Sequence, residues 1–196
     1  MKLVVGLGNP GRRYALTRHN AGFRIVERFA KGHGIDLSRQ RFAGRFGCGQ
    51  IEGHGGESID VCVLEPETFM NLSGESVAAA LRELPIDDPD QDMLVVVDDV
   101  DLPFGRVRVR PSGGSAGHRG LDSIITCIGS RGFPRLRFGI DRPACGADTA
   151  AYVLEEFSSS EAAYLDEHIG NAVNALETML VDGIKMAMNR YNGDQR

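Results

Sequence analysis

The chain has 196 residues, of which 42% are apolar and 25% charged, and its formal net charge is −5. This length favours a single domain over residues 1–196, and no apolar run is long enough to span a bilayer. The first residues lack the extended apolar segment of a secretory signal. We therefore expect a cytoplasmic protein without a membrane anchor.

The first predicted element is a buried strand over residues 2–7, which runs into a glycine turn that contains Asn9. Thr17 is placed to cap a helix with apolar residues at helical spacing from Phe23 onward. Asn9 and His19 thus follow the carboxyl end of a strand, where open α/β sheets hold their functional groups.

Residues 42–51 and 58–65 resemble two strands joined by a glycine-rich turn, which predicts a β-hairpin. Asn71 or Ser73 is expected to cap the helix that follows. The chain has four cysteines that form no C-x-x-C pair, so the sequence predicts reduced thiols; they are Cys48, Cys62, Cys127 and Cys145. No two histidines have metal-ligand spacing, so the sequence predicts no metal site.

A second apolar strand, over residues 93–97, runs directly into Asp98. Residues 106–110 alternate arginine and valine, which predicts a half-buried strand with one cationic face. A glycine-rich loop over residues 111–120 and a helix over 121–128 follow.

The last part of the chain contains a strand over residues 136–140 and a linker of small residues over 144–151. Residues 142–157 are interpreted as a lid over the substrate, and a long amphipathic helix begins at Ser159 and breaks at Asp182-Gly183. The alternation of strands and helices predicts an α/β fold, a single three-layer domain with a mostly parallel, twisted mixed sheet flanked by helices.

The net charge alone argues against nucleic-acid binding, but the charge is unevenly distributed. Residues 105–142 hold eight arginines and two aspartates, the arginines being Arg106, Arg108, Arg110, Arg119, Arg131, Arg135, Arg137 and Arg142. Such a segment can present a local anion site. The alternative is that these arginines lie on different faces and only keep the chain in solution.

His19 and Asp98 are the strongest candidates for chemistry. If their two strands are neighbours, the carboxylate can accept a hydrogen bond from the imidazole, which fixes the tautomer and makes the other ring nitrogen more basic. An imidazole of this kind acts as a general base near neutral pH. The competing interpretation is that His19 belongs to a helix N-terminal turn and Asp98 caps a loop.

Two other motifs match known patterns only formally. Gly6-x-Gly8-x-x-Gly11 has the dinucleotide-binding spacing, but the helix is delayed and the next acid, Glu27, lies inside it. Gly113-x-Ser115-x-Gly117 has the spacing of a nucleophile elbow, but no strand leads directly into the serine. We therefore expect no nicotinamide or other cofactor, and a flexible anion-binding loop at residues 111–120.

In combination these segments resemble the bacterial peptidyl-tRNA hydrolase family over nearly the whole chain. The matching motifs are Gly6-Leu7-Gly8-Asn9-Pro10-Gly11, Tyr14-x-x-Thr17-Arg18-His19-Asn20-x-Gly22, Thr68-Phe69-Met70-Asn71-Leu72-Ser73-Gly74, Asp98-x-x-Asp101-Leu102-Pro103, Gly113-Gly114-x-x-Gly117-His118 and Arg135-Leu136-Arg137-x-Gly139-Ile140. The resemblance implies a monomeric, metal-independent enzyme that hydrolyses the ester between a peptide and the 3′ ribose of tRNA.

By position, the resemblance makes His19 the catalytic base and Asp98 the residue that orients it. The substrate-binding residues it implies are Asn9, Tyr14, Asn20, Met70 and Asn71, and the residues that grip tRNA phosphate are Arg108, Arg110 and Arg137. One position departs from the family, which usually has asparagine where this chain has Arg119. Arg119 is therefore predicted only as a binding residue.

Two rival functions stay open at this point. A non-catalytic RNA-binding protein of the same fold, such as an organellar splicing cofactor, is disfavoured because Asn9, His19, Asn71 and Asp98 are all present. A nicotinamide-dependent oxidoreductase is disfavoured by the glycine turn described above. Release of an N-blocked amino acid from aminoacyl-tRNA separates the first rival from the hydrolase, and a cofactor titration tests the second.

Overall fold

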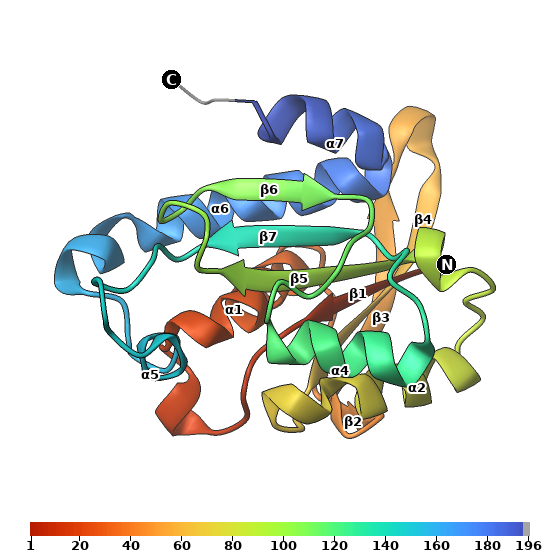
Figure 1. Ribbon diagram of the computed structural model, residues 1–196. Coiled ribbons are helices and arrows are strands. Elements are labelled where there is room, and N and C mark those ends of the chain that lie inside the picture. The colour runs from red at the N-terminus through yellow and green to blue at the C-terminus, as the bar shows by residue number, and fades with distance from the viewer. Residues whose placement is uncertain (194–196) are drawn as a thin grey trace.

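The computed structural model describes residues 1–193 and forms a seven-stranded sheet with helices on both faces (Figure 1). Its strands are β1 (Lys2–Gly6), β2 (Arg39–Arg41), β3 (Gly44–Glu52), β4 (Ser58–Pro66), β5 (Met93–Asp99), β6 (Val107–Arg110) and β7 (Arg135–Gly139). Its helices are α1 (Ala21–Gly32), α2 (Ser73–Glu83), α3 (Pro89–Asp92), α4 (Arg119–Ile128), α5 (Thr149–Tyr152), α6 (Ser159–Val181) and α7 (Ile184–Tyr191), with short 3₁₀ turns at η1 (Arg12–Tyr14), η2 (Arg18–Asn20), η3 (His54–Gly56) and η4 (Met70–Leu72).

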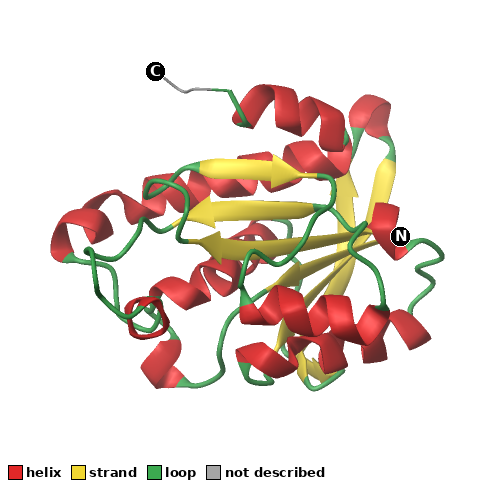
Figure 2. Cartoon of the chain, viewed as in Figure 1, coloured by secondary structure: helices red, strands yellow, loops and turns green. Residues whose placement is uncertain are grey.

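The strand order is β2-β3-β4-β1-β5-β7-β6, and the sheet is mixed. The four central strands, β4, β1, β5 and β7, are parallel to one another, whereas β2, β3 and β6 join the sheet by antiparallel pairing. The predicted three-layer α/β fold is therefore correct, and its parallel part is the centre of the sheet. Figure 2 shows the twist of the sheet between its two layers of helices.

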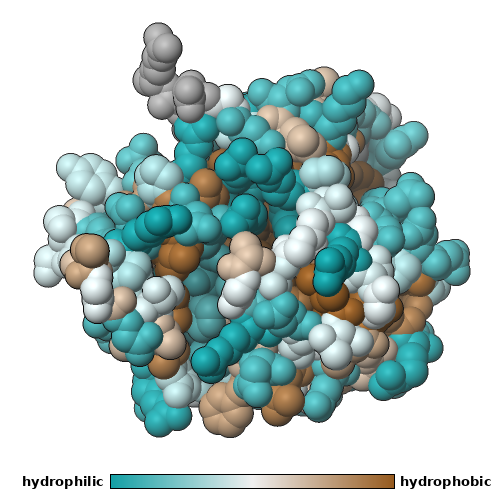
Figure 3. All heavy atoms as spheres, viewed as in Figure 1, coloured by the Kyte–Doolittle hydropathy of each residue, from teal (hydrophilic) through white to brown (hydrophobic). Residues whose placement is uncertain are grey.

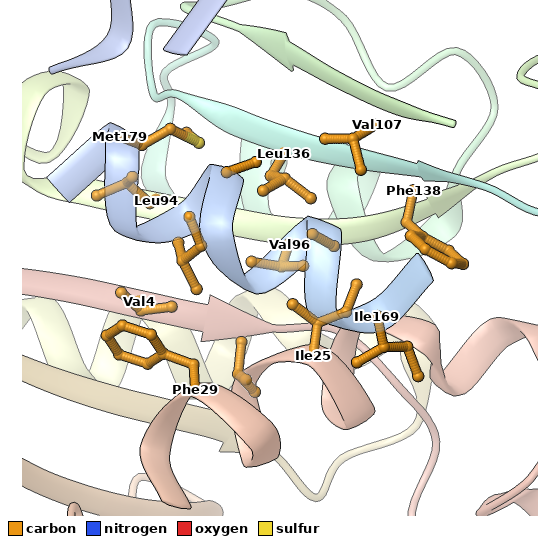
Figure 4. Close-up of a cluster of buried hydrophobic side chains, with 14 of the residues drawn as sticks. Val4, Ile25, Phe29, Leu94, Val96, Val107, Leu136, Phe138, Ile169 and Met179 are labelled. Carbon is orange, nitrogen blue, oxygen red and sulfur yellow. The ribbon is translucent and has the colours of Figure 1, made fainter. Parts of the chain in front are cut away.

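Each face of the sheet packs on its own layer of helices because alternate strand residues point to opposite sides. On one face the core is formed with α1, α6 and α7, and ten of its residues are labelled in Figure 4, including Val4, Ile25, Leu136 and Met179. On the other face α2 and α4 cover the sheet through residues such as Val77 and Ile124. β5 is buried along its whole length and β1 from Leu3 to Gly6, as their apolar sequences predict.

Several elements differ from the prediction. Neither Asn71 nor Ser73 caps α2, because the Ser73 hydroxyl donates to the Met70 carbonyl at 3.0 Å and η4 leads directly into the helix. The linker over residues 144–151 contains the start of α5, whose N-cap is Asp148. β2 and α3 were not predicted, since they are only three and four residues long and carry no clear periodicity.

The prediction of four reduced thiols is wrong for one pair. The hairpin of β3 and β4 places Cys48 directly opposite Cys62, with Cα atoms 4.0 Å apart, and the two form a disulfide. The two cysteines are 14 residues apart in the sequence and become neighbours only through the register of the hairpin, so their spacing did not indicate a disulfide. Cys127 and Cys145 are free and exposed.

No helix within residues 1–193 is long and apolar enough to cross a membrane.

Candidate active site

His19 and Asp98 meet at the carboxyl ends of two neighbouring parallel strands. β1 leads through the glycine turn to η2, which carries His19, and β5 contains Asp98 near its end. His19 Nδ1 lies 2.9 Å from each carboxylate oxygen of Asp98. This is the contact that the two strand-end positions predicted.

His19 borders a cavity of about 530 Å³. The cavity is lined by Asn9, Tyr14, His19, Phe69, Met70, Asn71, Gly117, His118, Arg119, Asp148, Thr149, Ala150, Val153 and Leu154. Within residues 1–193 the other ring nitrogen of His19, Nε2, makes no hydrogen bond, so it is the nitrogen available to a molecule in the cavity. Of the predicted substrate-binding residues, all except Asn20 line this cavity.

A second histidine, His118, contacts the same carboxylate and was not singled out from the sequence. Its Nε2 lies 3.0 Å from Asp98 Oδ1, and its Nδ1 accepts hydrogen bonds from the backbone N–H groups of Gly120 and Leu121 at the start of α4. Because Nδ1 accepts, the ring proton is on Nε2 and is donated to Asp98. His118 therefore caps α4 and orients Asp98. The sequence did not predict these two roles, because His118 follows a glycine-rich loop that has no helix or strand periodicity.

The electrostatics of the pair follow from its burial and its contacts. Burial is the largest single effect on the pKa of His19 and acts to lower it. The charge and the hydrogen bond of Asp98 together outweigh burial and raise the pKa above its ordinary value. The charge of Arg119 also acts to lower the pKa of His19. Burial acts to raise the pKa of Asp98, yet His19 and His118 hold it well below its usual range. Asp98 is thus ionised at neutral pH, and His19 can hold a proton taken from a substrate.

His19, Asp98 and His118 also have the composition of a metal site, since one ligand atom from each lies within 4.8 Å of the others. The tautomer of His118 does not suit this use. A metal on Nε2 would displace the proton donated to Asp98 and move the ring proton to Nδ1, where it would oppose two backbone N–H donors. The trio is therefore arranged for hydrogen bonding.

Asn9 is held rigidly at the edge of the cavity. Its side-chain oxygen accepts from the Met70 amide at 3.0 Å, and its backbone N–H and C=O bond to the Asn20 side chain at 2.9 and 3.0 Å. Within the described part of the chain the Asn9 side-chain nitrogen makes no hydrogen bond, and Asn9 is among the residues that line the cavity. Asn20, which lies outside the cavity lining, has the contacts of a group that positions Asn9, and its predicted contact with substrate stays a prediction.

The loop that carries His19 is tied to the opposite wall of the cavity. The backbone N–H groups of Arg18 and His19 donate to the carbonyls of Glu155 and Val153 at 3.0 and 2.8 Å. The buried Arg18 guanidinium bonds to the Glu156 carbonyl and, at 2.9 Å, to the Glu161 carboxylate. Residues 148–154 form this wall, and α5 lies beyond the carboxyl ends of β5 and β7 in Figure 1; motion of the wall as a lid stays a prediction.

The predicted phosphate-binding arginines lie on a neighbouring surface. Arg108, Arg110, Arg135 and Arg137 pair across β6 and β7 on one face of the sheet. Arg137 contacts Asp99 at 2.5 Å, and the buried Arg135 bonds to the carbonyls of Gly113 and Gly114. Burial and the charge of Arg137 lower the pKa of Arg135 to about 10, so Arg135 remains cationic at neutral pH.

A series of hollows joins these arginines to His19. A cavity of about 400 Å³ is lined by Arg110, Arg135 and Arg137 together with the glycine loop. A smaller hollow of about 250 Å³ shares Arg137 with it and shares His118 with the cavity of His19. Hydrophilic residues cover most of the face viewed in Figure 3. The hollow that Arg137 borders therefore adjoins the cavity of His19.

Fold and site together are those of an α/β enzyme with a histidine–carboxylate pair at the end of a parallel strand. The family model described as peptidyl-tRNA hydrolase matches residues 3–196. The chain therefore belongs to the peptidyl-tRNA hydrolase family.

Individual relatives agree over the whole chain. The chain is 46% identical to the peptidyl-tRNA hydrolase of Syntrophotalea carbinolica, covering 98% of this chain and 97% of that protein. It is 47% identical to that of Symbiobacterium thermophilum, covering 97% and 98% respectively. A crystal structure of peptidyl-tRNA hydrolase from Acinetobacter baumannii superposes with a TM-score of 0.86 at 40% identity, covering 98% of this chain and 95% of that one.

Proposed function

We propose that this protein hydrolyses the ester bond between a peptide, or an N-blocked amino acid, and the 3′ ribose of tRNA. The observation that carries the proposal is the contact of His19 Nδ1 with both oxygens of Asp98 at 2.9 Å, beside a cavity that Nε2 can reach. This arrangement supports general-base chemistry on a molecule held in the cavity.

In the proposed reaction, His19 Nε2 takes a proton from a water molecule that attacks the ester carbonyl. Asp98 stabilises the imidazolium that forms, and the proton then passes to the departing ribose oxygen. The amides of Asn9 and Asn71 hold the water or donate to the developing oxyanion, an effect of about 3 kcal/mol per donor in comparable enzymes. Tyr14, Met70 and Arg119 line the acyl side of the site, and Asn20 positions Asn9.

The tRNA is proposed to bind along the cationic face of β6 and β7. Arg108, Arg110 and Arg137 supply phosphate contacts, with Arg137 also held by Asp99. Contacts of this kind fix register without reading bases, and they weaken as salt rises. We further propose that residues 1–196 act as one domain and as a monomer in the cytoplasm.

The decisive experiment incubates the purified protein with an N-blocked aminoacyl-tRNA and measures release of the N-blocked amino acid. Wild type should release it, and His19→Ala should lower kcat by about 10³-fold because the general base is lost. Binding of His19→Ala to tRNA should stay close to that of wild type. Near-normal kcat in this variant would remove His19 as the base, and tRNA binding without hydrolysis by wild type would favour the RNA-binding alternative.

A further inference from the structure

Arg119 is a cation in the cavity without a partner of its own. Its side chain is exposed, and within residues 1–193 it makes no hydrogen bond or ion pair. Of the described residues that line the cavity of His19, it is the one arginine or lysine. A guanidinium left free in such a place is available to an anion.

The position of Arg119 is fixed even though its side chain is free. It is the first residue of α4, directly after His118, which bonds to Asp98 at 3.0 Å. The next residue, Gly120, packs so closely on Met70 that an added Cβ would lie 2.6 Å from the Met70 sulfur. These contacts place the start of α4 against η4, beside Asn71.

Arg119 also borders a second hollow of about 350 Å³. Arg119 and Asn71 line both, and Glu75 and Asp122 line only the second hollow. These two acids disfavour a phosphodiester there, and the arginines suited to phosphate, Arg110 and Arg137, line other hollows that Arg119 does not border. If tRNA lies along those arginines, as proposed above, the side of Arg119 is left for the acyl group.

The proposed reaction creates an anion on that side. Water oxygen bonds to the acyl carbon, the bond from that carbon to the ribose oxygen breaks, and the ribose oxygen takes a proton. The acid so formed loses its proton to solvent, so a neutral ester becomes a carboxylate. The charge of Arg119 reaches His19, whose pKa it acts to lower, and His19 is the group proposed to activate the attacking water. The carboxylate on the cavity wall, Asp148, is already engaged, because it caps α5 by accepting a hydrogen bond from the Ala150 N–H at 2.9 Å.

We propose that Arg119 binds the carboxylate of the released peptide, so that the protein holds its acyl product by charge. The inference rests on the proposed function, because only ester hydrolysis places a carboxylate at this point. The proposal assigns a function to Arg119, which stands where the family usually has asparagine. The protein should retain peptides with a free C-terminal carboxylate more tightly than the same peptides as neutral amides.

The test compares an N-acetyl dipeptide acid with its C-terminal amide, using Kd values from NMR titration at fixed ionic strength. Wild type should bind the acid about tenfold more tightly than the amide, as expected for one charge-assisted hydrogen-bonded pair. Arg119→Asn should bring the ratio to about one, since the remaining amide contacts do not distinguish the two ligands. Arg82→Asn, an exposed α2 position outside both cavity linings, is the matched control and should keep the wild-type ratio.

Two results would overturn the proposal. One is an unchanged acid-to-amide ratio in Arg119→Asn. The other is a loss of tRNA affinity in that variant with a salt slope reduced by about one, which would make Arg119 a phosphate contact. Because the titration needs no turnover, failure of the hydrolysis assay remains a separate outcome that bears on the proposed function alone.

Discussion

Two buried carboxylates flank β1 and have opposite ionisation behaviour. Asp98 lies near the carboxyl end of β5 and Glu65 near that of β4, and both strands pair with β1 in parallel. Their exposures are 3% and 0%. Burial alone therefore cannot explain why one is held as an anion and the other is not.

The difference lies in what faces each carboxylate. Asp98 receives His19 on both oxygens and His118 on one, which keeps its pKa well below the usual range. Within residues 1–193 the one cation that contacts Glu65 is Arg45, at 3.0 Å, and the same Arg45 nitrogen bonds to Glu27 at 2.6 Å. Burial and the charge of Glu27 raise the pKa of Glu65 to about 8. The negative charge of Asp98 is thus maintained by its hydrogen-bond donors, His19 and His118, and not by its position in the sheet.

Removing the charge of Asp98 should have the largest effect. We expect Asp98→Asn to lower kcat by about 10²–10⁴-fold, because the imidazolium loses its counterion. The pKa of His19 should also fall, since burial and Arg119 would act without opposition. The acid limb of the pH–kcat profile should therefore move to lower pH; a limb that stays in place would mean that the profile does not report His19. A thermal melt of the variant separates this effect from unfolding.

Neutralising Glu65 should affect stability and leave catalysis alone. A carboxyl whose pKa is raised from 4.5 to about 8 on folding contributes stability at low pH that is lost as pH rises through that interval. Glu65→Gln should therefore increase the free energy of unfolding above pH 8 by about 1–3 kcal/mol, with little change near pH 4. Urea unfolding of both proteins across this pH range measures the difference. Equal stability of the two proteins at every pH would mean that Glu65 ionises normally.

His118 tests whether the second donor to Asp98 matters beyond helix capping. His118→Ala removes both functions and should lower kcat about tenfold and the free energy of unfolding by about 1 kcal/mol. Asparagine is a good N-cap but is too short to repeat the contact with Asp98. His118→Asn should thus restore stability without restoring kcat. If kcat recovers with stability, His118 acts only through α4.

This comparison also shows what sequence could and could not predict. The apolar run of β5 ends at Asp98 and that of β1 leads into the turn before His19, so the sequence predicted that both residues follow carboxyl ends of strands. Their contact depended on β1 and β5 being neighbours, which the structure shows. His118 acts through the Asp98 carboxylate and two backbone N–H groups, and Arg18 through a backbone carbonyl; such contacts leave no periodic pattern. Glu65 has the sequence of an ordinary strand residue beside a proline, and Glu27, whose charge helps to raise its pKa, lies on α1 and is remote in sequence.

Replacing Arg119 should have the smallest effect on the pH–kcat profile, and it tests how a positive charge near His19 compares with the negative charge of Asp98. Asp98 and Arg119 act on the pKa of His19 in opposite directions, the first raising it and the second lowering it. Arg119→Asn should therefore move the acid limb of the pH–kcat profile to slightly higher pH, opposite to Asp98→Asn. Raising salt should reduce the shift, because Arg119 is exposed and its field is screened, whereas the buried contact of Asp98 is not. A limb that moves to lower pH in Arg119→Asn would show that the substitution acts by changing the structure of the site and not by its charge.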